Sequence, residues 1–133
     1  KPSSAASDVY KRQVPSGAPS MFQAITGRSW DEQTEISTLA DGLAVRVPIT
    51  DIVEDVASLV DDIWLVEESK LLPAVRTFME TESVLAEPSA AITLAGLVEH
   101  KVSFAGKRVA MIVTGAHINM SLMSDILGTE PLL

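Results

Sequence analysis

The residues best suited to chemistry follow an uninterrupted apolar run near the end of the chain. Residues 109–113 read Val-Ala-Met-Ile-Val, and Thr114, Gly115, Ala116 and His117 come next. This order places a hydroxyl, a glycine that tolerates unusual backbone angles and an imidazole at one point. An apolar run without polar alternation predicts a parallel strand buried on both faces. Because ligands of open α/β sheets bind outside the carboxyl ends of the strands, we expect a ligand site there.

Two other segments carry polar groups in patterns that also have an ordinary structural explanation. Asp41 and Gly42 form a turn dipeptide, and Glu87 precedes a Pro-Ser pair that is typical of a helix start. Gly42 can simply close a turn, and Glu87 can be a first-turn carboxylate that the helix dipole stabilises by about 0.3–1 kcal/mol. Thr114 can cap a helix, and the pattern around it, taken alone, favours that explanation.

Hydrophobic periodicity predicts the elements that must position these groups. We expect helices over residues 21–27, ending at Gly27, from 48–51 onward, over 67–81, from Pro88 onward and over 120–127. We expect strands over residues 63–66 and 109–113, and a loop followed by a short strand over 38–45. Alternation of strands and helices predicts an α/β fold, a parallel sheet flanked by helices.

The first thirteen residues differ from the rest of the chain. Residues 1–13 are small and polar, without a periodicity that would bury a face, and they resemble the translated adapter found at the ends of metagenomic reads. An ordinary disordered terminus is the alternative. We therefore divide the chain into an unstructured segment, 1–13, and a domain, 14–133.

Composition narrows the class of protein. The 133 residues are the size of one domain, 47% of them are hydrophobic, and the net charge is −8. An acidic chain without a basic stripe argues against nucleic acid as a partner. No apolar run approaches the roughly 20 residues of a membrane span, so we expect no membrane partner. The absence of cysteine fits a reducing cytoplasm and excludes disulfides and thiol-based metal sites, and we expect no metal.

Three segments together resemble the C-terminal part of a known enzyme family. They are residues 114–117, the Thr-Leu-Ala-Asp-Gly-Leu-Ala segment over 38–44 and the Glu-Pro-Ser-Ala-Ala segment over 87–91. In this combination the chain resembles the threonine/serine dehydratase branch of the fold-type II pyridoxal-phosphate (PLP) enzymes, which have the tryptophan synthase beta-like fold. The resemblance covers roughly residues 14–123 and implies PLP as the cofactor.

The resemblance also implies roles for individual residues. The Thr114 hydroxyl would bond the pyridine nitrogen of PLP, with Gly115 and Gly42 lying close to the cofactor and Glu87 near the ring. Asp41 and His117 would line the site, although the family's usual asparagine is replaced by His117. A hydroxyl cannot protonate the ring as a carboxylate would, which suits β-elimination.

Other parts of the family's machinery lie outside this chain. None of its five lysines stands in the context of the Schiff-base lysine, and no two glycines are adjacent as a phosphate-binding loop would require. We therefore expect no catalytic residue here, and a fragment that is inactive alone.

The resemblance implies that the full-length protein is a cytoplasmic homo-oligomer. It would convert a hydroxy amino acid such as threonine or serine to a 2-oxo acid and ammonia, as in isoleucine biosynthesis. Threonine synthase, serine racemase, diaminopropionate lyase or a cysteine synthase-like enzyme are alternatives within the fold. A non-catalytic α/β binding module is an alternative outside it.

Overall fold

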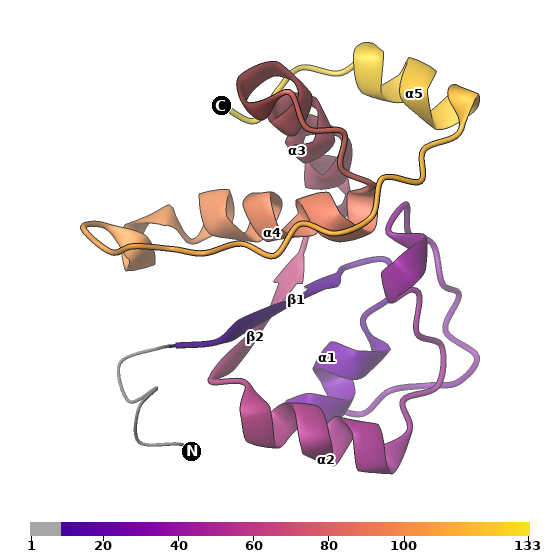
Figure 1. Ribbon diagram of the computed structural model, residues 1–133. Helices are drawn as coiled ribbons and strands as arrows, with labels where there is room; N and C mark the ends of the chain where they lie inside the picture. The colour runs from indigo at the N-terminus through magenta and orange to yellow at the C-terminus, as the bar shows by residue number, and fades with distance from the viewer. Residues whose placement is uncertain (1–8) are drawn as a thin grey trace.

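Two parallel strands lie at the centre of the structure. The computed structural model describes residues 9–133. β1 (Lys11–Pro15) and β2 (Asp62–Val66) pair in parallel and in register from their first residues to their last (Figure 1). Ser16 continues the pairing, because its N–H donates to the Val66 carbonyl at 2.8 Å. The β2 strand was expected at this place from its short apolar run, and the structure confirms it.

Helices flank the sheet on both sides, as the α/β prediction requires. α1 (Ser20–Ile25) and α2 (Thr50–Leu59) lie on one side, and α4 (Pro88–Glu99) packs against both strands from the other (Figure 1). α3 (Leu71–Thr77) packs on α4, and α5 (Met120–Leu127) packs on α3. The predicted α/β class is therefore confirmed, and the bounds predicted for α5 match the structure residue for residue.

Short turns connect these elements. Three 3₁₀ turns are η2 (Asp41–Leu43), η3 (Glu68–Lys70) and η5 (Lys101–Phe104), and a π-helical turn, η4 (Phe78–Glu82), extends α3. The helix expected over residues 67–81 is thus built from η3, α3 and η4 in succession. The short strand expected within residues 38–45 is wrong, because η2 occupies its place.

The core forms where α4 meets the sheet and α3. Small residues on α4 allow a close approach: an added Cβ at Gly96 would lie 2.9 Å from Cγ of Gln13 on β1. The side chains that are fully buried and largest include Leu71, Val75, Ile92, Ile126 and Val66. Burying a side chain of this kind stabilises the fold by about 1.5–3 kcal/mol. This core holds the amino-terminal end of α4 in a fixed position.

Residues 109–113 do not form the expected interior strand. They run past α4 as a coil, and 43% of Val109 and 79% of Ile112 are exposed (Figure 1). From residue 108 to 114 the backbone makes no hydrogen bond to any other residue within the described range. A strand exists only through hydrogen bonds to a neighbour, and no strand lies beside this run in the described structure. Val113 of this run packs against the buried core.

The expected boundary between residues 13 and 14 cuts through β1. Lys11, Arg12 and Gln13 were expected to be unstructured, yet each pairs with a residue of β2. Their pairing with β2 and the packing of β1 against α4 outweigh a composition that lacks periodicity, although Arg12 itself is exposed. Residues 1–8, the rest of the segment expected to be unstructured, lie outside the described residues. None of the helices in the described part of the chain is long and apolar enough to span a membrane.

Candidate functional site

Three segments far apart in the sequence meet at the amino-terminal end of α4. The N–H of Gly42 donates to Oγ of Ser89 at 3.0 Å. The N–H of Glu87 donates to the carbonyl of Gly115 at 3.1 Å, and the N–H of His117 donates to Oε2 of Glu87 at 3.0 Å. The partners in the two side-chain contacts are 47 and 30 residues apart. The structure therefore brings the three sequence segments together in one cluster, which we call the α4 cluster: Gly42, Glu87, Ser89, Gly115 and His117.

Glycine is required at position 115 for two reasons. Its φ of +92° is a conformation that residues with a Cβ rarely adopt. An added Cβ would also lie 2.5–2.8 Å from the carboxylate atoms of Glu87, closer than van der Waals contact allows. At Gly42 an added Cβ would lie 3.1 Å from Oγ of Ser89 and 4.0 Å from Oε1 of Glu87. Two glycine backbones thus approach the same carboxylate.

The side chains expected to face a ligand are free to do so. Thr114 and Asp41 are exposed, and neither side chain makes a hydrogen bond or ion pair to another described residue. The helix-cap explanation for Thr114 is wrong, because α5 begins only after Asn119. Oδ1 of Asn119 accepts the N–H of Leu122 at 2.8 Å and is the cap of that helix.

Glu87 is the N-cap residue of α4, with Pro88 as the first helical residue. Its side chain does not bond the N–H groups of its own helix and instead reaches the backbone at His117. The carboxylate still benefits from its place near the positive end of the helix dipole. No lysine takes part in the contacts of the α4 cluster within the described residues.

Sequence reasoning missed two residues that hold this region. Ser89 was seen only as part of a helix-start pattern, yet it accepts the Gly42 N–H. Glu68, just after β2, accepts backbone N–H groups from two other segments. The position of Glu68 was a usable signal, because polar residues that follow parallel strands gather at one edge of the sheet.

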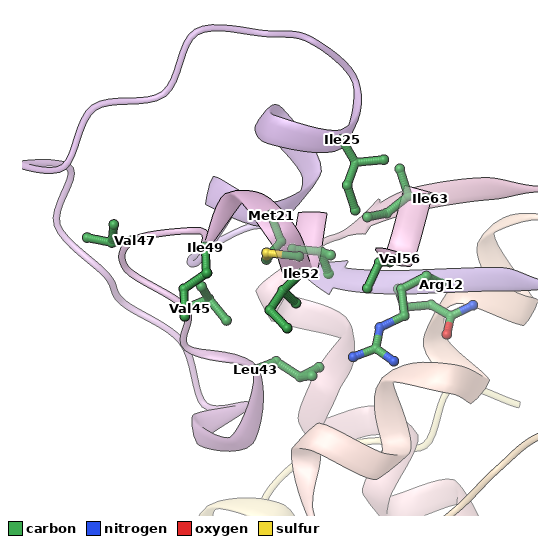
Figure 2. Close-up of a pocket in the computed structure, with 12 residues that line it drawn as sticks. Arg12, Met21, Ile25, Leu43, Val45, Val47, Ile49, Ile52, Val56 and Ile63 are labelled. Atoms are coloured by element: carbon green, nitrogen blue, oxygen red, sulfur yellow. The ribbon is translucent and has the colours of Figure 1, made fainter. Parts of the chain in front are cut away.

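An apolar cavity of about 250 Å³ lies away from the α4 cluster, between β1, α1 and α2. Figure 2 shows apolar side chains from α1, α2, β2 and residues 43–49 around this space, with Val47 farthest out and the Arg12 guanidinium at one side. Arg12 and Gln13 are its polar lining residues, and Leu43 of η2 is its link to the segment that carries Gly42. The cavity holds no member of the α4 cluster, so the candidate site is the exposed cluster and not this cavity.

Comparison with known proteins defines the class of protein. A family model described as "Pyridoxal-phosphate dependent enzyme" matches residues 9–115, and the chain therefore belongs to this family. The catabolic L-threonine dehydratase of Staphylococcus aureus is 29% identical over 110 residues. That alignment covers 80% of this chain and 32% of the relative, so the chain spans about a third of that protein's length.

Two solved structures resemble this one. A threonine deaminase of T.th. superposes with a TM-score of 0.76 at 23% identity, over 89% of this chain and 39% of its own. Maize serine racemase superposes with a TM-score of 0.71 at 26% identity, over 92% of this chain and 39% of its own. The fold is thus that of fold-type II PLP enzymes, and the cofactor of the family is PLP.

Thr114 and the α4 cluster next to it suit one part of such a cofactor. The exposed hydroxyl of Thr114 is free to bond a ring nitrogen, and Gly42 and Gly115 are exposed and carry no side chain that would bar a flat ring. No glycine-rich loop in the described chain offers the N–H groups that would hold a phosphate. The fit is therefore to the ring and not to the phosphate group.

Proposed function

We propose that this chain is the C-terminal part of a PLP-dependent ammonia-lyase of the threonine/serine dehydratase type. Its substrate would be a hydroxy amino acid, which leaves as a 2-oxo acid and ammonia. The observation that carries the proposal is the convergence of residues 114–117, Gly42 and Glu87 on the amino-terminal end of α4. The similarity to threonine dehydratases supports the reaction type.

In this proposal Thr114 and the α4 cluster next to it form the wall that faces the cofactor ring. Thr114 would donate a hydrogen bond from its hydroxyl to the pyridine nitrogen, while Gly115 and Gly42, which have no side chain, would leave room for the ring. Glu87 holds the backbone at His117 and places a carboxylate near the ring. Asp41 and the imidazole of His117 line the outer part of the site. PLP itself supplies the electron-withdrawing group that the elimination needs.

The first test uses this chain alone. Its described residues include no lysine in contact with the α4 cluster and no glycine-rich phosphate-binding loop, so PLP should form no stoichiometric borohydride-reducible adduct on it and serine should not be consumed. Mass spectrometry after borohydride treatment measures the adduct. An adduct on one lysine with full occupancy would contradict the proposal that the Schiff-base lysine lies outside this chain.

The second test uses the complete polypeptide that carries this segment. Thr114→Val removes a hydrogen bond of about 0.5–1.5 kcal/mol and leaves a ring nitrogen unpaired at a further ~1–3 kcal/mol, so PLP affinity should fall by one to three orders of magnitude. Thr114→Ser keeps the hydroxyl and is the matched control. A valine variant with unchanged PLP dissociation constant and elimination rate would remove Thr114 from the site.

Serine racemase activity is the second candidate, because maize serine racemase shares this fold at 26% identity. Product analysis separates the two: a lyase yields pyruvate from L-serine, whereas a racemase yields D-serine. We further propose that the complete protein is a cytoplasmic homo-oligomer and that its substrate is an amino acid. A non-catalytic module would leave both products absent in the complete polypeptide.

A further inference from the structure

Glu68 ties together three parts of the chain at the carboxyl edge of the sheet. Oε1 of Glu68 accepts the N–H of Gly17 at 3.0 Å, and Oε2 accepts the N–H of Leu39 at 3.2 Å. The backbone N–H of Glu68 donates to Oγ of Ser16 at 3.2 Å. Gly17 and Leu39 are separated from Glu68 by 51 and 29 residues. One side chain therefore fixes both the loop after β1 and the segment that leads to η2.

The two segments that Glu68 joins are packed without space for a side chain. The N–H of Ser37 donates to the Gly17 carbonyl at 2.9 Å. An added Cβ at Gly17 would lie 1.7 Å from the Ser37 carbonyl oxygen and 2.8 Å from Oε1 of Glu68. The absence of a side chain at Gly17 thus allows direct contact between its backbone and that of Ser37. The Glu68 carboxylate bonds the N–H of the same glycine.

From the contacts of Ser37 and Leu39 with Gly17 and Glu68, the chain runs only a few residues to Gly42 in the α4 cluster. Ala40 is fully buried and its N–H donates to Oγ1 of Thr38 at 3.0 Å, which keeps the path short and fixed. The carbonyl of Ala40 accepts the N–H of Leu43 at 2.8 Å and closes η2. Gly42 then donates to Ser89 at the far end. The segment 37–42 is held at Ser37 by the Gly17 carbonyl, at Leu39 by Glu68 and at Gly42 by Ser89.

We propose that Glu68 is a positioning residue for the ring-facing wall, and this inference rests on the function proposed above. Glu68 touches no member of the α4 cluster, and it acts by fixing where the segment that carries Gly42 begins. A carboxylate suits this task because its two oxygens can accept two N–H groups from different segments at once.

The experiment measures amide hydrogen exchange in this chain by NMR, without cofactor. Glu68→Ala removes both acceptors, and exchange at Gly17 and Leu39 should accelerate by about tenfold or more, as loss of a hydrogen bond to a charged group implies. The decisive signal is Gly42, whose exchange should also accelerate although it does not contact Glu68. Glu68→Gln keeps one oxygen and should release only one of the two direct partners.

Glu67→Gln is the matched control, because Glu67 is exposed and its side chain makes no hydrogen bond to another described residue. It removes the same charge one position away and should leave all three amides unchanged. Exchange at Val75 in the core reports whether the fold is intact in each variant. If Glu68→Gln and Glu68→Ala leave Gly42 unchanged while Val75 stays protected, Glu68 does not position the segment and the inference is overturned. Because no cofactor is present, this result does not depend on whether PLP binds the α4 cluster.

Discussion

Replacement of Gly115 by alanine tests the geometry of the α4 cluster directly. The substitution meets two separate costs in the structure. A φ of +92° strains a residue with a Cβ by about 1–3 kcal/mol. The new Cβ would also lie 2.5 Å from the carboxylate carbon of Glu87, so that carboxylate must move and lose its hydrogen bond to the His117 N–H. This loss adds about 1–2 kcal/mol, at or below the lower end of the roughly 1.5–3 kcal/mol of a hydrogen bond to a charged group, because His117 is exposed and Glu87 is only half-buried.

Gly106 offers a matched control within the same chain. Its φ is +72°, and an added Cβ would meet no atom within 4 Å. Gly106→Ala therefore carries the backbone strain without the clash, and the two variants share the same gain from a less flexible unfolded chain. We expect Gly115→Ala to lower the free energy of unfolding by about 1–2 kcal/mol more than Gly106→Ala.

Urea unfolding followed by circular dichroism gives these free energies. A double-mutant cycle with Glu87→Ala isolates the clash, because without the carboxylate Gly115→Ala should cost no more than Gly106→Ala. Equal destabilisation by the two glycine substitutions in the original chain would refute the contact between Gly115 and Glu87. The Glu87 carboxylate would then not lie against Gly115, although the hydrogen bond from the Glu87 N–H to the Gly115 carbonyl would be untouched by this result.

Three other features of the structure can be tested by smaller perturbations. Residues 108–114 should exchange their amide hydrogens near the rate of an unfolded peptide while the amides of β2 stay protected, because their backbone is unpaired within the described chain. Burial raises the pKa of Asp62, but hydrogen bonds from the Trp64 indole and from Lys11 outweigh it and hold this pKa below 3.8. The resulting stability is present above pH 3.8 and is lost as pH falls through the lowered pKa, so Asp62→Asn should flatten that acid limb of the stability profile. Ser89→Ala removes the acceptor of an exposed N–H in η2 and should lower the free energy of unfolding by about 0.5 kcal/mol, which Ser89→Thr should largely restore.

Local pattern was sufficient to predict most helices and the α/β class. α5 was predicted with correct bounds because apolar spacing and a glycine after its end act within a few residues. Pro88 likewise predicted the start of α4. The segments that would form the candidate site were also recognisable. Their cofactor roles stay predictions.

The contacts inside the site could not be predicted from pattern, since each joins residues far apart in the sequence. Glu87 was expected to act on its own helix through the dipole, yet its carboxylate reaches His117, 30 residues away. Ser89 reaches Gly42 over 47 residues. A carboxylate or hydroxyl can accept any nearby N–H, so its partner is decided by packing and not by its neighbours in sequence.

The strand prediction for residues 109–113 was wrong for a different reason. The rule that predicts a buried strand from an apolar run assumes a neighbour on each side, since burial and backbone hydrogen bonds both require one. Within the described chain, Met111 and Val113 line a shallow cavity with Leu94 of α4, while Ile112 faces outward. The side chains on one face of this run therefore contact α4, whereas its backbone N–H and C=O groups have no partner within the described residues. The apolar run thus predicts that these residues have apolar neighbours. Their backbone forms a strand only where another strand lies beside it.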